Sequence, residues 1–326
     1  MGVTSHDVAR LAGVNQSTVS RALRGTPGVA EQTQRRVREA AATLGYVPSD
    51  AGRALSTRRT GSIGVLSGEL TNPFYPELVE PIRESLLAAG FRPVLIPDSP
   101  SEPFDPDRWA RGVFDGMILA TARAGSQIPQ QLRRHGIPFV FANREIPAIE
   151  ADRCVSDNAA GARAAAELIV ELGHVRVAAV MGPEDTSTGR ERDSGFRNEL
   201  QRSGIVFQND HFERGEFTFG VGYAATARLV SRLAPTAIFC ANDVLALGAA
   251  DALMAAGAAD STMLVGFDDI SSAGRRVYDL TTVHTDIALM GRTAVDLLIS
   301  RIEDPTRPYE RVVLPTSMIR RRLLAN

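Results

Sequence analysis

The stretch VARLAGVNQSTVSRAL, residues 8–23, places a glycine between two short runs that each carry apolar residues at helical spacing. In the first run, Val8, Leu11 and Ala12 stand at positions i, i+3 and i+4, so one helix face can be buried. Gly13 stands where a helix end needs a left-handed residue, a conformation that glycine adopts without steric cost. The stretch therefore predicts two short helices joined by a tight turn.

The second helix is predicted to begin near Gln16, with Asn15 as its N-cap. Its apolar stripe is formed by Val19, Ala22 and Leu23. Two short helices joined by such a turn cross at a steep angle, which lets the second helix enter a DNA major groove. The outward face of this helix carries side chains suited to base edges and phosphates, namely Gln16, Ser17, Ser20 and Arg21. The alternative interpretation is a solvated helical hairpin with no role in DNA binding.

A third helix is predicted over residues 31–44, where Gly45 ends the helical pattern. Thr4 or Ser5 is expected to cap the first helix. Three helices within about 45 residues form a minimal bundle. The following residues 48–60 contain a proline, small residues and three arginines, and we interpret them as a linker. The buried face of the third helix is predicted to consist of Val37, Ala40, Ala41 and Leu44.

The charge of the chain is unevenly distributed. Residues 1–60 contain nine arginines and four acidic residues, which gives this segment +5 and leaves −7 on the remainder of a chain whose net charge is −2. All 36 basic residues are arginine. A basic first segment on an acidic body indicates that only the first segment meets a polyanion.

Composition and length indicate a protein of two or three domains. The chain has 326 residues, of which 44% are hydrophobic and 23% charged, as in soluble globular proteins. Its two cysteines, Cys154 and Cys240, lack the paired spacing of a zinc site, and we expect no metal, cofactor or disulfide. No signal peptide and no apolar run of about 18 residues is visible, so a cytoplasmic protein without a membrane partner is expected.

From residue 62 onward, short apolar runs alternate with helical patterns. Runs that are apolar on both faces and separated by amphipathic helices predict parallel sheets covered on each side. Seven such runs suit two sheets better than one, and the division between them is expected near Asp157. The run TTVHTD, residues 281–286, is expected to return the chain to the first lobe. The seven runs are SIGVLS, RPVLIP, GMILA, PFVFAN, VRVAAVMG, TAIFCAN and MLVGFDD.

Polar and aromatic residues follow several of these strands. In open α/β sheets ligands bind beyond the carboxyl ends of the strands, and here two such edges are expected to face one cleft. Carboxylate, amide and guanidinium groups around aromatic rings can bind hydroxyls and stack on sugar faces. The alternative for each polar residue is to cap the next helix. The residues at the strand ends are Asn72, Phe74, Tyr75, Asn143, Arg144, Asn242, Asp243, Asp268 and Asp269.

Three other classes of protein are alternatives to this interpretation. GVGYAA, residues 220–225, fits G-x-G-x-x-A with Asp243 about 20 residues further on, as a dinucleotide-binding enzyme requires, but the preceding EFTF is a poor buried strand. No G-x-S-x-G motif occurs, so an esterase-type nucleophile elbow is absent, and the five histidines lack metal-ligand spacing. A cytoplasmic NAD-dependent or sugar-modifying α/β enzyme is the alternative function. An exported sugar-binding protein would share the body but not the helix-turn-helix.

DVARLAGVNQSTVSRAL, LGYVP and RALSTRRTGSIGVL, in this order, resemble the lactose-repressor (LacI/GalR) family of bacterial transcription regulators. The resemblance runs the whole chain. It implies an N-terminal all-α helix-turn-helix domain and an α/β periplasmic-binding-protein-like body of two doubly wound parallel-sheet lobes. The implied domains are residues 1–47 for the helix-turn-helix, 48–60 for the hinge, 61–158 with 287–316 for the first lobe, and 159–286 with 317–326 for the second.

By this resemblance, base contacts are made by Gln16, Ser17 and Arg21 and phosphate contacts by Thr4, Asn15, Thr18 and Ser20. Arg24 adds a phosphate contact and Arg58 contributes to sequence-independent affinity. The linker becomes a hinge helix on DNA, with Leu55 as a wedge in the minor groove. Gly52 stands where alanine is usual in the family, which weakens this hinge by roughly 1 kcal/mol.

The resemblance also implies a ligand-responsive regulator, most simply a repressor and not an enzyme, that senses a small metabolite such as a sugar. A homodimer is expected, because one recognition helix reads too few base pairs and two-fold pairing matches a pseudo-palindromic operator in double-stranded DNA. Effector contacts are implied for Phe74, Asn143, Arg192, Phe217, Asn242 and Asp268, to which the strand-end argument adds Asn72, Tyr75 and Arg144.

Overall fold

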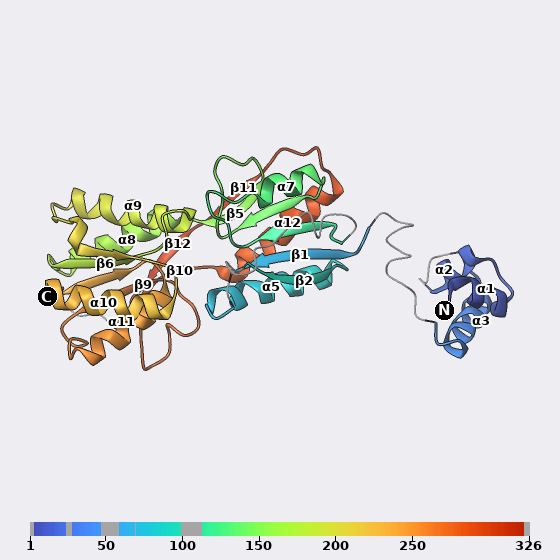
Figure 1. Cartoon of the computed structure of the whole chain (residues 1–326), viewed down its shortest axis with the longest axis horizontal. Helices are drawn as coiled ribbons and strands as arrows, with labels where there is room; N and C mark the ends of the chain where they lie inside the picture. The colour runs from blue at the N-terminus through green and yellow to red at the C-terminus, as the bar shows by residue number, and fades with distance from the viewer. Residues whose placement is uncertain (1–2, 24–27, 47–58, 69, 99–112, 323–326) are drawn as a thin grey trace. The chain divides into compact units, whose positions relative to one another are not determined.

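The computed structural model describes residues 3–23, 28–46, 59–68, 70–98 and 113–322. Its contacts divide the chain into two units, residues 1–60 and 61–326 (Figure 1). Three of the residues predicted to contact DNA, Arg24, Leu55 and Arg58, lie outside the described residues, as does Gly52.

The first unit contains the predicted helix-turn-helix and the third helix. α1 spans Ser5–Ala12, α2 spans Gln16–Leu23 and α3 spans Glu31–Thr43. Thr4 caps α1 through a capping box, in which the backbone N–H of Asp7 donates to Thr4 Oγ1 at 3.4 Å and Thr4 N donates to Asp7 Oδ2 at 3.0 Å. Gly13 has φ +62°, as the end of α1 requires. The predicted cap and turn are both confirmed.

The core of this unit differs from the prediction at one position. Leu11, expected on the buried face of α1, is 54% exposed, and Ala9 is buried in its place beside Val8 and Ala12. Small side chains on this face let three short helices approach closely, so the larger leucine side chain is turned outward. The buried residues are Val8, Ala9, Ala12, Val19, Ala22, Val37, Ala40 and Ala41, with Leu23 and Leu44 packed against them.

Arg36 on α3 joins the first and third helices. Its Nη2 donates to the carbonyl oxygen of Ala12 and, at 3.5 Å, to that of Gly13. A cation at a helix C-terminus satisfies unpaired carbonyls and opposes the negative end of the helix dipole. Arg36 therefore contributes to the angle between α1 and α3 without entering the small apolar core.

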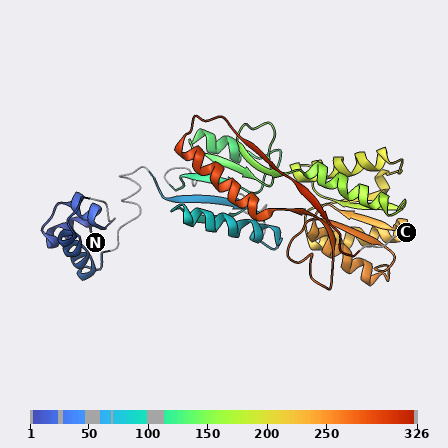
Figure 2. The same cartoon turned by 180° about the vertical axis from the view of Figure 1, so that it is seen from behind.

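The second unit contains two six-stranded sheets, each in its own lobe, as predicted (Figures 1 and 2). Lobe 1 has the strand order β11-β5-β4-β3-β1-β2, all parallel. Lobe 2 has the order β12-β10-β9-β8-β6-β7, in which only β12 is antiparallel to its neighbour. The strands are β1 Ser62–Ser67, β2 Arg92–Pro97, β3 Gly116–Leu119, β4 Phe139–Ala142, β5 Asp152–Ser156, β6 Val177–Met181, β7 Phe212–Arg214, β8 Ala237–Cys240, β9 Met263–Asp268, β10 Thr281–Thr285, β11 Arg311–Leu314 and β12 Thr316–Ile319.

Helices cover both faces of each sheet. In lobe 1, α5 and α12 pack on one face of the sheet, with α12 against β3, β4 and β5, and α7 lies on the other (Figure 2). In lobe 2, α8 and α9 form one helical layer and α10 and α11 the other (Figure 1). The helices are α5 Phe74–Ala88, α7 Ile128–Arg134, α8 Asn158–Glu171, α9 Ser187–Arg202, α10 Phe219–Leu233, α11 Asp243–Ala255 and α12 Ile287–Glu303, with a 3₁₀ turn at Asn209–His211.

The chain passes between the lobes three times. It leaves lobe 1 after β5 and enters α8, returns from β10 into α12, and leaves again between β11 and β12, where one residue separates the two strands. Because three adjacent crossings join the same two bodies, the lobes can change their mutual angle while each sheet stays intact.

A buried ion pair fastens α12 to the lobe 1 sheet. Asp152 on β5 is fully buried, and its oxygens lie 2.8 Å and 3.2 Å from Nε and Nη2 of Arg301 on α12. The carboxylate also accepts from the backbone N–H of Glu310 at 2.9 Å, and Arg301 donates to the carbonyls of Pro305 and Pro308. The pair is thus hydrogen-bonded on all sides, which offsets the cost of burying two charges.

We expect Asp152→Ala to lower the free energy of unfolding by about 3–5 kcal/mol, because it leaves the Arg301 cation buried without its partner. Urea unfolding followed by circular dichroism measures the change. Asp260→Ala is the control, since Asp260 is 95% exposed in its ion pair with Arg322 and should cost at most about 1 kcal/mol. Equal losses in the two variants would contradict the role given to the buried pair.

Candidate functional site

All nine side chains predicted to bind an effector line one small cavity between the lobes. Each is less than a tenth exposed. Lobe 1 contributes residues that follow β1 and β4, and lobe 2 contributes residues from α9, from the loop before α10, and from the ends of β8 and β9. The cavity is lined by Asn72, Phe74, Tyr75, Asn143, Arg144, Thr188, Arg192, Phe217, Asn242 and Asp268.

Arg192 on α9 is the most highly connected of these side chains. Its Nε donates to Asn158 Oδ1 at 2.9 Å, its Nη1 donates to the carbonyl of Ala241 at 2.7 Å, and its Nη2 lies 2.8 Å from Asp268 Oδ1. The guanidinium stacks over the Phe267 ring at 3.7 Å. These contacts fix the guanidinium plane. Burial raises the pKa of Asp268, and the positive charge of Arg192 opposes this rise.

The backbone around Asp268 is strained. Asp268 and Asp269 have φ angles of 112° and 59°, in the region that favours glycine. Thr285 Oγ1 donates to the Asp268 carbonyl at 3.3 Å, while the Asp269 carboxylate lies 2.7 Å from Arg321 and 3.0 Å from His284 Nδ1. Contacts on both sides therefore hold the turn that directs the Asp268 side chain into the cavity.

Two adjacent residues at the start of α11 have different roles. Asn242 is the N-cap of α11, its Oδ1 accepting from Leu245 N at 2.9 Å, and it also lines the cavity. Asp243 is fully buried beneath the site, where Oδ2 accepts from Ile270 N at 2.9 Å and Oδ1 accepts from Thr282 Oγ1 at 2.5 Å. Asp243 thus supports the loop after Asp268 and does not line the cavity.

The first lobe contributes aromatic and amide groups. Asn72 Oδ1 accepts from Phe74 N at 3.1 Å, which orders the turn into α5. The rings of Phe74 and Tyr75 meet edge to face with centroids 5.6 Å apart. Burial raises the pKa of Tyr75, so its hydroxyl remains a neutral donor and acceptor at the cavity wall.

Arg144 differs from the other buried arginines of the body. Its side chain lies 5.3 Å from the Phe217 ring centroid, and its Nε is buried without a hydrogen-bond partner. Arg144 is only 8% exposed, yet no carboxylate within the described ranges forms an ion pair with its guanidinium. A buried donor left unpaired is costly unless a ligand or water supplies an acceptor. Arg144 Nε is therefore able to donate to an oxygen atom of a ligand bound in the cavity.

A second, larger cavity of about 760 Å³ adjoins the first and shares Asn72, Tyr75, Arg144 and Phe217 with it. Besides Thr71 and Thr218, four additional polar residues line it, and none of these six was predicted from the sequence. Three of the four follow strands β2 and β3, so the strand-end argument applied to every strand could have found them. The fourth follows β7, a strand too short and polar to be recognised. These residues are Asp98, Thr121, Arg123 and Glu216.

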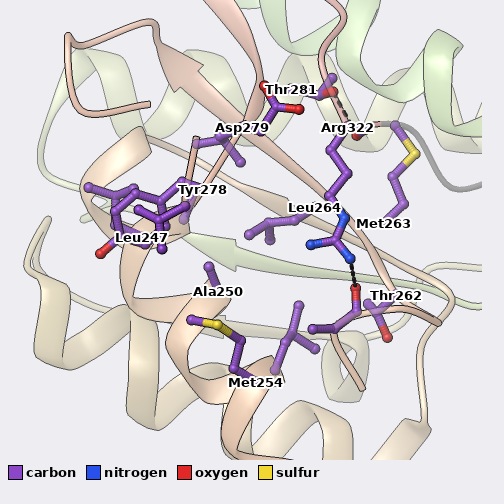
Figure 3. Close-up of a pocket in the computed structure, with 15 residues that line it drawn as sticks. Leu247, Ala250, Met254, Thr262, Met263, Leu264, Tyr278, Asp279, Thr281 and Arg322 are labelled. Atoms are coloured by element: carbon purple, nitrogen blue, oxygen red, sulfur yellow. Dashed lines mark hydrogen bonds between the residues drawn. The ribbon is translucent and has the colours of Figure 1, made fainter. Parts of the chain in front are cut away.

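A separate pocket in lobe 2 has a different character (Figure 3). It lies beside α11 and β9, encloses about 50 Å³, and has a mostly apolar lining that includes Leu247, Met254 and Tyr278. Its polar groups bond to one another: Thr281 Oγ1 donates to the Arg322 carbonyl at 2.9 Å, and Arg322 Nη2 donates to the Ala259 carbonyl at 3.2 Å. Among the described residues, no fully buried side-chain polar atom without a partner lines this pocket, whereas the cleft between the lobes has such atoms and is the candidate ligand site.

Only some of the residues predicted to contact DNA are fully exposed on the surface of the helix-turn-helix. Gln16, Ser17 and Arg21 are exposed on α2, and Asn15 is exposed just before it, whereas Thr18 and Ser20 are half-buried. Gln16 Nε2 donates to Ser5 Oγ at 3.2 Å. The Thr4 hydroxyl donates to Asp7 Oδ2 at 2.7 Å, so donation from this hydroxyl to a phosphate would compete with its bond to the Asp7 carboxylate.

The structure also bears on the enzyme alternatives. The run GVGYAA lies inside α10 rather than in a strand-to-helix turn, and a Cβ on Gly222 would lie 2.1 Å from the Leu245 carbonyl oxygen. Gly222 therefore lets α10 approach α11 closely. The described residues include no cluster of three or more His, Cys, Asp or Glu side chains able to hold a metal ion. Over the same part of the chain, no helix is both long and apolar enough to cross a membrane.

Comparison with known proteins agrees with this architecture. The family described as "Bacterial regulatory proteins, lacI family" matches residues 4–49, and "Periplasmic binding protein-like domain" matches residues 166–322. The chain is 31% identical to the ribose operon repressor of Escherichia coli (strain K12), over 98% of both chains.

Two solved structures are similar over nearly the whole chain. A complex of the transcriptional regulator CelR with cellobiose aligns with a TM-score of 0.75 and 32% identity, covering 98% of this chain and 99% of that one. A lac repressor dimer bound to operator and the anti-inducer ONPF aligns with a TM-score of 0.84 and 25% identity over 98% of each chain.

A helix-turn-helix unit followed by a two-lobed body with a polar cleft defines a DNA-binding transcription regulator with a ligand-binding domain. The chain belongs to the lacI family of bacterial regulatory proteins.

We expect Asp243→Asn to reduce the dependence of stability on pH. Burial, reinforced by the charge of Asp268, raises the pKa of Asp243 well above the usual 3.8. Below pH 3.8 the carboxyl is protonated in both states; as the pH rises, the unfolded chain ionises first, so stability falls until the folded pKa is reached.

Asparagine can accept from Ile270 N through its oxygen and donate to Thr282 Oγ1 through its NH2, but it cannot ionise. The pH-dependent loss should therefore disappear, at about 1.4 kcal/mol per unit of pKa difference. Urea unfolding of both proteins at several pH values between 4 and 8 tests this. Parallel pH profiles for wild type and Asp243→Asn would show that the buried carboxyl does not titrate as described.

Proposed function

We propose that the chain is a homodimeric repressor that binds a pseudo-palindromic operator through α2 and responds to a neutral sugar held between its lobes. The observation that carries the effector proposal is the small cavity between the lobes, which we call the inner cavity. In it the Arg192–Asp268 ion pair lies beside Arg144, whose Nε has no hydrogen-bond partner. Two relatives have structures with a bound sugar, cellobiose in the CelR complex and ribose in a LacI family regulator from Enterococcus faecium, and both support a sugar here. Acting on bacterial DNA, the protein would work in the cytoplasm.

The chemistry of the cavity favours a polyhydroxylated ligand. A carboxylate accepts from a hydroxyl and a guanidinium donates to its neighbour, so Asp268 and Arg192 can bind adjacent hydroxyls of one ring. Asn143 and Asn242 offer both donors and acceptors. Phe74 and Phe217 provide apolar faces for the C–H surface of a ring. An anionic ligand would be repelled by Asp268, which favours a neutral one.

For DNA binding, we propose that Gln16, Ser17 and Arg21 read bases, while Asn15, Thr18 and Ser20 contact phosphates. Thr4 can join the phosphate contacts only by exchanging its bond to Asp7. Arg24, Arg58 and the Leu55 wedge complete the proposed interface. The lobes are assigned to residues 61–158 with 287–316 and to 159–286 with 317–326, with residues 48–60 as the hinge.

Ligand and operator are proposed to be coupled through the angle between the lobes. A ligand that contacts both lobes favours one angle and thereby changes the lobe 1 surface available to the dimer and the order of the hinge. Thermodynamic linkage makes the effect reciprocal: ligand and operator change each other's affinity by one common factor, typically about 5- to 150-fold.

We expect Asp268→Ala to abolish the ligand response while leaving operator affinity without ligand within about twofold, since Asp268 lies in a different unit from α2. Fluorescence anisotropy on an operator selected from a random DNA library, with and without the sugar identified by thermal shift, measures both quantities. Asp296→Ala, on the exposed side of α12, is the matched control. A normal response by Asp268→Ala would refute the assignment of the cleft.

The two classes of DNA contact should separate by mutation. Arg21→Ala is expected to relax specificity at one operator position by about 1–3 kcal/mol, because Arg21 is exposed on the face of α2 proposed to read bases. Arg58→Ala should weaken all sequences alike and reduce the salt dependence. Competition binding against operator variants at several salt concentrations distinguishes them. Equal losses on selected and random DNA for both variants would contradict the assignment.

A further inference from the structure

The two cavities of the cleft differ strongly in size. The inner cavity encloses about 20 Å³, room for roughly one water molecule, whereas the outer cavity encloses about 760 Å³. Four residues line both, so the two cavities adjoin. The inner polar cluster can therefore contact only one end of a ligand, and the body of the ligand must lie in the outer cavity.

Polar groups in the outer cavity are arranged to bind hydroxyls away from the inner cluster. Asp98, after β2, accepts from the Thr121 hydroxyl at 3.0 Å and has unfilled acceptor positions. Across the cavity stands Glu216 of lobe 2, which lies 2.6 Å from Arg123 of lobe 1. Each side of the outer cavity thus carries a carboxylate that can accept from ligand hydroxyls.

An aromatic platform lies in the same cavity. Phe219, the first residue of α10, lines it and is 41% exposed, whereas Phe217 and Tyr75 are buried in the shared wall. A large exposed apolar ring is removed from water when the face of a sugar ring covers it, which favours binding. Phe219 is therefore placed to stack on a ring that lies beyond the one held by the inner cluster.

We propose that the outer cavity is a second sugar subsite and that the effector has at least two linked neutral rings. The inner cluster binds one ring by its hydroxyls, and Phe219, Asp98 and Glu216 bind the next. A single ring would leave most of the outer cavity filled with water. This inference rests on the proposed function, because it specifies the size of the sugar that the cleft accepts.

Ion pairs between the two lobes lie at the second subsite, so binding there can affect the angle between the lobes. Arg123 lies 2.9 Å from both oxygens of Asp185 and 2.6 Å from Glu216, and it lines the outer cavity. These three side chains are 41–58% exposed, so the ion pairs alone contribute little. A second ring that covers them excludes water and strengthens the bridge between the lobes.

The test is calorimetric titration of the full chain with disaccharides of several linkages (cellobiose, maltose, lactose, sucrose) and their component monosaccharides. We expect one disaccharide to bind at least about tenfold more tightly than its monosaccharides. Phe219→Ala should weaken that disaccharide about three- to tenfold, the worth of one aromatic contact, and leave monosaccharide affinity unchanged. Asp98→Ala should act in the same way, by about tenfold.

Tyr223→Ala is the matched control, because Tyr223 lies on the same helix, is 42% exposed and lines neither cavity of the cleft. Asp268→Ala should lose both classes of sugar. Equal affinity for mono- and disaccharides, or equal losses of both in Phe219→Ala, would overturn the second subsite and leave the proposed function intact. No binding of any sugar in the panel to the wild type would overturn the sugar proposal and the subsite with it.

Discussion

The buried pair between Arg192 and Asp268 is the interaction on which the cleft depends. Removing two such charges from water costs several kcal/mol for each ion, and one mutual contact at 2.8 Å does not offset that cost by itself. The additional hydrogen bonds from Arg192 to Asn158 and to the Ala241 carbonyl offset the remaining cost of removing the charges from water. As a result α8, α9, β8 and β9 meet at one guanidinium, and lobe 2 presents a rigid polar wall.

Lobe 1 meets that wall through few and mostly exposed contacts. Apart from the Arg123 bridges, Ala124 N donates to the Asp185 carbonyl at 2.8 Å, Glu145 N donates to Ser187 Oγ at 3.0 Å and Ser271 N donates to Glu77 Oε1 at 2.9 Å. Contacts of this kind contribute little each, so the angle between the lobes is set by a small free-energy difference. A ligand needs only a modest preference for one angle to change the population, which is the property that a sensor requires.

The sequence was sufficient to predict the helix-turn-helix, the seven apolar strands and the convergence of nine side chains on one cavity. Most of these features follow from periodicity, from glycine at a left-handed position and from the geometry of parallel sheets, whereas Arg192 and Phe217 were implied only by the resemblance to the LacI/GalR family. Strands β5, β7, β11 and β12 were not predicted because they are short and carry arginine, aspartate or threonine. They therefore lack the continuous apolar run that indicates a buried strand. Ala9 is buried instead of Leu11 because the three helices approach closely. The distance between helices cannot be predicted from the apolar pattern of one helix alone.

The charges around the cleft also explain why a neutral ligand suits it. Arg123, Arg144 and Arg192 stand against Asp98, Asp185, Glu216 and Asp268, so positive and negative groups alternate over short distances and nearly cancel. An anion drawn to Arg144 would meet Asp268 nearby, and a cation drawn to Glu216 would meet Arg123. A hydroxyl both donates and accepts, so a sugar can satisfy neighbouring groups of opposite charge without introducing charge of its own. The same alternation that rejects ions therefore allows each hydroxyl to find a partner on either lobe.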